Sequence, residues 1–137
     1  MTGIQIVQSA STVPERVVPN DELNAYMDTS DEWISTRTGI KQRHVSTGQT
    51  TSDLCTQVAQ KLLDQTDWQA SDLDFIIVAT MSPDYMTPAT AAIVQGRIGA
   101  KKAFAFDLNA ACSGFIYGLK VAEGLLQTPG TRGVLIG

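Results

Sequence analysis

The sequence has little of several features that mark specialised protein classes. Its 137 residues include two cysteines, five prolines, 11 glycines and one histidine. So few cysteines argue against a disulfide scaffold, and so little glycine and proline excludes a collagen-like repeat. Positive charge is also scarce, because 10 Lys and Arg stand against 14 Asp and Glu, which argues against nucleic acid as the main partner. The remaining composition, 43% hydrophobic and 18% charged, is typical of one compact globular domain.

Long apolar stretches are missing as well. No run of about 18 apolar residues occurs, so we expect no membrane-spanning segment. The N-terminus lacks a basic start followed by an apolar stretch, and it therefore shows no export signal. Cys55 and Cys112 lack CxxC spacing, and we expect both to be reduced in the cytosol.

Short apolar runs recur along the chain and predict strands. Apolar and polar residues alternate from Ile4 to Ala10, which predicts a strand there. Nearly continuous runs predict buried strands over Asp74 to Ala79, Phe104 to Phe106 and Gly133 to Gly137. A continuous run is typical of a strand covered on both faces, so Asp74 to Ala79 is predicted to be a central parallel strand.

Helices are predicted between these strands. Asn20 is the expected N-cap of a short helix, and a second short helix is expected from Ser30 to a stop at Gly39. Three longer helices are expected, beginning at Thr51 or Ser52, at Pro88 and at Cys112, the last ending near Gln127.

The alternation of helices with buried strands predicts an α/β layered fold, with a mostly parallel mixed sheet and covering helices. The sequence stops directly after the apolar run Gly133 to Gly137, with nothing beyond it to cover that run. We therefore expect the chain to be cut short, and a legitimate terminal strand is the alternative.

The strongest chemical signal is Cys112, which lies between a predicted strand and a predicted helix. Small residues surround it in the sequence DLNAACSGF, which predicts a tight turn that exposes the thiol. Unpaired amides and the dipole at a helix N-terminus favour a thiolate, and the same amides can bind the oxyanion of a thioester under attack. Cys112 is therefore a candidate nucleophile. The alternative is a small buried hydrophobic residue, which we expect Cys55 to be.

Several segments together resemble one enzyme family. The segments DTSDEWI (residues 28–34), RTGI (37–40), RH (43–44) and AACSGF (110–115) are similar to those of β-ketoacyl-acyl-carrier-protein synthase III. Enzymes of this family catalyse the initiating condensation of bacterial type II fatty-acid synthesis. The cysteine turn alone would also fit another acyltransferase of the thiolase superfamily. A non-catalytic half-domain that binds coenzyme A thioesters is a third hypothesis.

The resemblance implies a thiolase fold, of which residues 1–137 would be the N-terminal half, in a cytoplasmic homodimer. It implies that Cys112 takes an acyl group from acetyl-CoA or a short or branched acyl-CoA. Malonyl-acyl-carrier protein then decarboxylates and attacks the acyl-enzyme, which gives 3-oxoacyl-acyl-carrier protein. No metal and no permanently bound cofactor is implied, because acyl-CoA is a substrate. The family's decarboxylating histidine and asparagine come from the second half, so we expect this chain alone to be inactive in condensation.

The resemblance also implies residues that bind substrate. Trp33 and Arg37 match residues that hold the adenine end of coenzyme A, and an indole and a guanidinium can sandwich a purine. Thr29 is expected to add a hydrogen bond there. Thr87 falls where acetyl-preferring members often carry phenylalanine, in a loop (Pro83 to Pro88) that shapes the partner's acyl pocket, so a roomier pocket is predicted. Without the motif, Trp33 and Arg37 would be interpreted as an ordinary i,i+4 helix pair.

Overall fold

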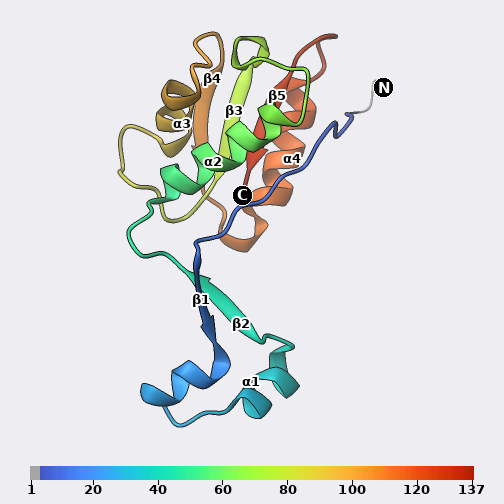
Figure 1. The fold of residues 1–137 in the computed structure, drawn as a ribbon. Coiled ribbons are helices and arrows are strands. Elements are labelled where there is room, and N and C mark those ends of the chain that lie inside the picture. Colours follow the sequence, from blue (N-terminus) through green and yellow to red (C-terminus); the bar gives the residue numbers. More distant parts are fainter. Residues whose placement is uncertain (1–3) are drawn as a thin grey trace. The chain divides into compact units, whose positions relative to one another are not determined.

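The structure, a computed structural model, describes residues 4–137, and these fall into two compact units (Figure 1). The larger unit comprises residues 4–12 and 50–137, and the smaller one residues 13–49. The larger unit contains Cys112 and Thr87. The smaller unit contains the three residues expected to bind coenzyme A, which are Thr29, Trp33 and Arg37.

A three-stranded parallel sheet forms the centre of the larger unit. Strand β3 (Phe75–Ala79) lies between β4 (Phe104–Leu108) and β5 (Gly133–Ile136). The predicted central parallel strand is therefore confirmed, and β4 is two residues longer than expected. β4 is an edge strand of this sheet, and its Phe104 is 51% exposed, so the prediction of a fully buried strand there is wrong.

Helices cover both faces of this sheet (Figure 1). Helices α2 (Thr51–Asp64) and α3 (Thr90–Ile98) lie on one face, and α4 (Gly114–Leu125) lies on the other. Short 3-10 helices, η2 (Ala70–Asp72) and η3 (Ala111–Ser113), precede β3 and α4. The three α-helices confirm the predicted ones, although α3 and α4 each begin two residues later than expected. The resulting three layers confirm the predicted α/β fold.

The continuous apolar sequence of β3 follows from these layers. Side chains of a strand point alternately to opposite faces of the sheet. Ile76 and Val78 pack in the cluster formed with α2 and α3, whereas Phe75 and Ile77 pack in the cluster that includes Ala122 of α4. Both faces of β3 are therefore interior, and a polar residue at any of these positions would be buried.

The N-terminal segment differs from its prediction. Residues 4–10 form no strand, although their apolar and polar side chains alternate. The segment instead borders a mostly apolar cavity of about 400 Å³ whose other walls come from α2, α4 and β5. A strand requires ladder hydrogen bonds to a neighbour, which an alternation of side chains does not by itself provide.

The smaller unit contains an antiparallel pair of strands that the sequence did not predict. Strand β1 (Arg16–Pro19) pairs with β2 (Gln42–Val45), and between them lie the 3-10 helix η1 (Asn20–Ala25) and α1 (Asp31–Thr38). The predicted second short helix is confirmed as α1. Its N-cap is Ser30, whose hydroxyl accepts the Trp33 N–H at 3.0 Å, and Gly39 ends it with φ of 73°.

The prediction for Asn20 is wrong. It is the first residue of η1 rather than its N-cap, and the N-cap residue is Pro19. The Asn20 side chain is buried and donates hydrogen bonds to Asp31 and to the Ile40 carbonyl, so it connects η1 to α1 and to the residues after it. The proline that precedes it has a fixed φ suited to an extended residue before a helical turn.

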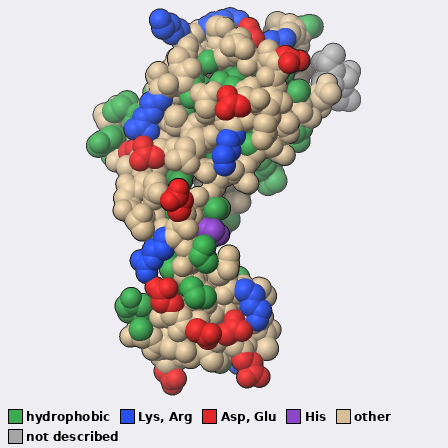
Figure 2. Space-filling view, in the orientation of Figure 1, with side chains coloured by type: hydrophobic (Ala, Val, Ile, Leu, Met, Phe, Trp, Pro, Cys, Tyr) green, Lys and Arg blue, Asp and Glu red, His purple; other side chains and the backbone are tan. Residues whose placement is uncertain are grey.

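Charged side chains of both signs are interspersed on the face drawn in Figure 2. Partly exposed pairs such as Arg97 with Asp53 (2.8 Å) and Lys102 with Asp74 (2.7 Å) contribute little stability each, because water screens them. Within residues 4–137, no helix combines the length and the apolar character needed to cross a bilayer.

Candidate active site around Cys112

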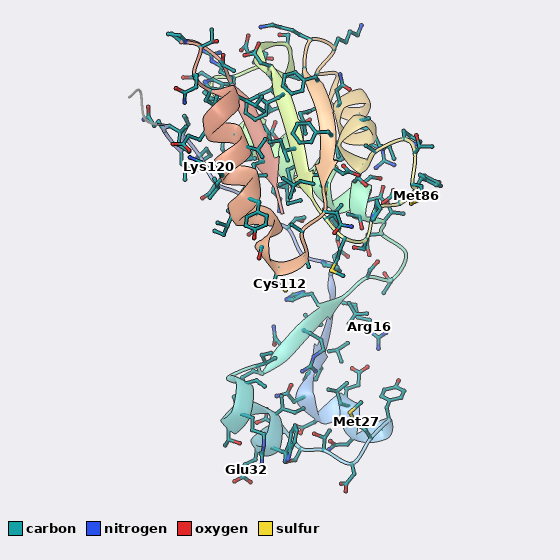
Figure 3. All side chains as sticks on the ribbon, turned by 180° about the vertical axis from the view of Figure 1, so that it is seen from behind. Arg16, Met27, Glu32, Met86, Cys112 and Lys120 are labelled. Carbon is teal, nitrogen blue, oxygen red and sulfur yellow. The ribbon has the colours of Figure 1, made fainter. Side chains whose placement is uncertain are left out.

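Cys112 lies on the turn that joins β4 to α4 (Figure 3). The turn is the 3-10 helix η3, and its first residue, Ala111, has φ of +46°. An L-residue adopts this left-handed region only at a cost, and such residues concentrate at functional sites. The side chain of Cys112 is exposed. The structure therefore confirms an exposed thiol on a tight turn just ahead of a helix.

Glycines hold this turn and its helix close to the sheet. A Cβ atom on Gly114 would lie 3.4 Å from the Ala79 Cβ at the end of β3, and one on Gly118 would lie 2.6 Å from Leu135 Cδ1 of β5. The small residues of α4 therefore allow the helix to approach the sheet closely.

Only one face of α4 is buried among the described residues. Gly114, Gly118 and Ala122 are buried, whereas four large apolar residues are exposed: Phe115, Ile116, Tyr117 and Val121. The sequence is apolar nearly all round, which predicts a helix inside a core. In residues 4–137 that prediction holds for the sheet-facing side alone.

Cys55, the second thiol, lies in α2 and is 7% exposed. Burial, followed by the nearby carboxylates of Asp107 and Asp84, raises the pKa of the Cys55 thiol to about 11. The thiol is therefore protonated at neutral pH, and thiols react as thiolates. The prediction that Cys55 belongs to the core is confirmed, and Cys55 offers an internal control for Cys112.

Thr87 lies in the loop between β3 and α3, at the same edge of the sheet as the Cys112 turn. Both segments follow the carboxyl ends of neighbouring parallel strands, which meet at one edge. Thr87 is exposed, and so are its neighbours Tyr85 (62%) and Met86 (99%), the latter labelled in Figure 3. The loop thus presents apolar side chains at its tip.

Trp33 and Arg37 of α1 form a stacked pair in the smaller unit. The Arg37 guanidinium carbon lies 4.4 Å from the centroid of the Trp33 ring, and Arg37 Nη1 donates to the Trp33 carbonyl at 3.2 Å. A purine between the two planes would need about 7 Å, twice an ordinary contact distance. A sandwich therefore requires Arg37 to move, whereas the outer faces of the pair are available now. Thr29 is half-buried, just before the N-cap of α1.

A polar network beneath α1 is a feature that sequence reasoning missed. Asn20 Nδ2 donates to Asp31 Oδ1 at 2.8 Å and to the Ile40 carbonyl at 2.7 Å, and its Oδ1 accepts from Arg43 at 2.7 Å. The hydrogen bond from Lys41, followed by those from Asn20 and Ser35, lowers the pKa of Asp31 to about 2. These residues are distant in sequence, so no local pattern indicates the network.

Comparisons with known proteins agree with the motifs. The family described as 3-oxoacyl-[acyl-carrier-protein] synthase III matches residues 106–136, which include Cys112. The β-ketoacyl-[acyl-carrier-protein] synthase III of Levilactobacillus brevis is 60% identical over 134 residues. The chain matches part of a β-ketoacyl-[acyl-carrier-protein] synthase III. The match covers 98% of this chain and 41% of the relative, so the chain spans about two fifths of that relative's length.

Solved structures of synthase III share the fold. The enzyme of Aquifex aeolicus VF5 superimposes with a TM-score of 0.85 at 41% identity, covering 90% of this chain and 40% of that one. The Thermus thermophilus enzyme gives 0.83 at 48% identity, covering 89% of this chain and 38% of that one. The fold of these residues is therefore the thiolase-like α/β fold of synthase III. Among residues 4–137, no three His, Cys, Asp or Glu side chains gather as a metal site.

Proposed function

We propose that Cys112 is the acyl-accepting nucleophile of a synthase III that starts fatty-acid synthesis. Its Sγ attacks the thioester carbonyl of acetyl-CoA or another short acyl-CoA. The bond between the acyl carbon and the coenzyme A sulfur breaks, and coenzyme A leaves as a thiolate that takes up a proton. The observation that carries this proposal is the exposed cysteine on a strained turn inside the segment matched by the family.

The second half of the proposed reaction uses malonyl-acyl-carrier protein. Loss of carbon dioxide leaves a carbanion that attacks the acyl group on Cys112, and the thiolate departs as 3-oxoacyl-acyl-carrier protein forms. The single histidine, His44, lies in β2 and contacts the Pro14 carbonyl through Nδ1 at 2.7 Å. We do not assign it to decarboxylation. Residues that assist this step, and a homodimer in the cytoplasm, belong to the proposal for the complete enzyme.

The adenine end of coenzyme A is proposed to stack on the Trp33 and Arg37 pair. Trp33 is 54% exposed, so its indole offers a free face for a purine. Thr29 would add a hydrogen bond at this end. Trp33→Ala is expected to weaken binding of coenzyme A, whereas Tyr26→Ala, which removes another exposed aromatic of the same unit, should not. Equal losses in both variants would contradict this assignment.

Acyl transfer is tested by incubating the chain with radiolabelled acetyl-CoA and locating the label by peptide mass spectrometry. We expect label on Cys112 and none on Cys55, and Cys112→Ala should abolish it. The matched control combines Cys112→Ala with Ser113→Cys, which keeps an exposed thiol but moves it by one residue. Equal labelling of this control would show that exposure alone accounts for the reaction. Binding of coenzyme A without any labelling would favour the non-catalytic binding module.

Thr87 is proposed to leave room for primers longer or more branched than acetyl. The comparison is between acetyl-, butyryl- and isobutyryl-CoA as acyl donors to wild type and to Thr87→Phe. We expect Thr87→Phe to retain acetyl transfer and to lose the longer and branched groups, because a phenylalanine fills space that a threonine leaves. Identical selectivity in the two proteins would overturn the assignment.

A further inference from the structure

The N-terminus of α3 is capped by a carboxylate from another element. Its own N-cap residue, Ala89, provides no side-chain hydrogen bond. Asp107 of β4 supplies the acceptors instead, because its Oδ2 accepts the Thr90 N–H and its Oδ1 accepts the Ala91 N–H, both at 2.7 Å. A local cap would stabilise the helix alone. This distant cap also ties the start of α3 to the strand that leads into the Cys112 turn.

The loop that precedes α3 is held at its other end as well. Asp84 accepts the Ser52 N–H at 3.0 Å and the Ser52 hydroxyl at 2.6 Å, and Thr51 donates to the Ser82 carbonyl at 2.7 Å. The loop is therefore fixed to α2 on one side and to β4 on the other. Its exposed tip, which includes Thr87, lies between these two anchors. Of the two carboxylates, Asp107 is the one that lies on β4, the strand that leads into the Cys112 turn.

Two further features lie near Asp107 in the fold, the buried hydroxyl of Thr90 and the left-handed backbone of Ala111. Thr90 is fully buried, and within residues 4–137 its Oγ1 has no hydrogen-bond partner. A buried hydroxyl without a partner is costly and rare in folded proteins. Five residues beyond Asp107 lies Cys112, just after the strained backbone of Ala111. The Thr80 N–H also donates to the Leu108 carbonyl at 3.1 Å, which joins the first residue of the loop to the end of β4.

We propose that Asp107 is a positioning residue for acyl transfer at Cys112. Its carboxylate fixes the start of α3 and the loop from Thr80 to Ala89 against the end of β4, and so holds in place the strand end from which the Cys112 turn begins. The proposal rests on the proposed function for its role in catalysis. A misplacement of about 1 Å at a reacting group can slow a reaction about a hundredfold, so this junction can control the rate without touching the substrate.

The test compares Asp107→Asn with a matched control. The asparagine has one carbonyl oxygen, so only one of the two α3 amides keeps an acceptor. Asp74→Asn is the control, because Asp74 accepts the Arg132 N–H at 2.9 Å and pairs with Lys102 at 2.7 Å. Asp74 precedes β3, so it lies at the sheet edge opposite the Cys112 turn. Near-ultraviolet circular dichroism verifies that both variants are folded.

The first readout does not depend on acyl transfer. Cys112 is alkylated with small iodoacetamide and with bulky N-phenylmaleimide, and the ratio of the two rates measures the access to the thiol. We expect Asp107→Asn to change this ratio several-fold and Asp74→Asn to leave it near the wild-type value. An unchanged ratio in Asp107→Asn, or an equal change in both variants, would overturn the proposal.

The second readout is the selectivity of Cys112 among acetyl-, butyryl- and isobutyryl-CoA. Asp107→Asn should alter this selectivity, whereas Asp74→Asn should change all three rates alike or not at all. If the wild-type chain accepts no acyl group, the proposed function fails, and the alkylation ratio still decides the positioning role. If wild type is acylated and Asp107→Asn keeps its selectivity, the positioning role fails and the proposed function stands.

Discussion

At the scale of single residues, Ala111 shows how the turn presents Cys112. It is the one non-glycine residue with a clearly positive φ in the described part of the chain. The left-handed conformation costs an L-residue about 1–2 kcal/mol, and a β-branched side chain more. We expect Ala111→Gly to raise the free energy of unfolding by up to about 1 kcal/mol, and Ala111→Val to lower it by about 2 kcal/mol. Urea denaturation measures both, and equal losses in the two variants would contradict the strained turn.

Asp31 gives the smaller unit a defined dependence on pH. Hydrogen bonds, first from Lys41, lower the pKa of Asp31 from 3.8 to about 2. A carboxyl whose pKa is lower in the folded state stabilises the fold above its unfolded pKa, and this stabilisation is lost as the pH falls through the folded value. We therefore expect α1 to loosen between about pH 4 and pH 2.

The fluorescence of Trp33, in a Trp68→Phe background, follows this acid transition. Asp31→Asn removes the titrating group, so its signal should stay nearly flat over the same range. An acid transition at the same pH in Asp31→Asn would assign it to another carboxyl.

At the scale of elements, the close contact between β3 and β5 provides a test of how the sheet is packed. A Cβ atom on Gly133 of β5 would overlap the ring of Phe75, which is buried beneath α4. Overpacking of this kind costs about 1–3 kcal/mol. We therefore expect Gly133→Ala to lower the free energy of unfolding by that amount.

The matched control for Gly133 is Gly124 of α4. A Cβ there would have no neighbour within 4 Å, so Gly124→Ala should raise the stability of the helix by about 0.5–1 kcal/mol. Thermal and urea denaturation of both variants measure the difference. A destabilised Gly124→Ala together with an unaffected Gly133→Ala would contradict the packing of β5.

The elements that the sequence predicted well are those whose signals are local. β3 is apolar at every position because both faces are covered, and α1 carries its cap and its stop in the adjacent residues Ser30 and Gly39. The β1 and β2 pair was missed, because each strand has four residues and neither shows a clear pattern. Residues 4–10 were wrongly predicted to be a strand, because an alternation of apolar and polar residues does not reveal whether a pairing partner is present.

The same distinction applies to the candidate site. The small residues around Cys112 predicted its exposed turn. Asp107, by contrast, is linked to Thr90 and Ala91 at the start of α3, which lie 17 and 16 positions earlier in the sequence and on a different element. Such a contact depends on how β4 and α3 pack, which composition and periodicity do not encode. The stacking of Arg37 on Trp33 was predictable as an i,i+4 pair, but its distance was not.

At the scale of the whole molecule, apolar surface dominates the expected behaviour of the chain in solution. α4 exposes Ile116 at 63% and Tyr117 at 56%, and a mostly apolar cavity lies under residues 4–12. Contiguous exposed apolar surface promotes association. We expect the 137-residue chain to self-associate as its concentration rises, measured by sedimentation velocity.

Two substitutions locate the surface that drives this association. Ile116→Lys should weaken it, because it places a charge on the exposed face of α4. Tyr26→Lys, which makes the same change of charge at a residue 74% exposed in the smaller unit, should have little effect. Equal effects of both variants would assign the association to net charge rather than to α4.

The burial of β3 also determines how the chain aggregates when the larger unit unfolds. The five residues FIIVA from Phe75 to Ala79 have high strand propensity and contain neither charge nor proline. Segments of this kind form intermolecular β-structure when chains expose them. Asp74 stands directly before the segment, so one charged residue borders it at that end. The strand that organises the folded sheet is therefore also the segment through which heat-unfolded chains would aggregate.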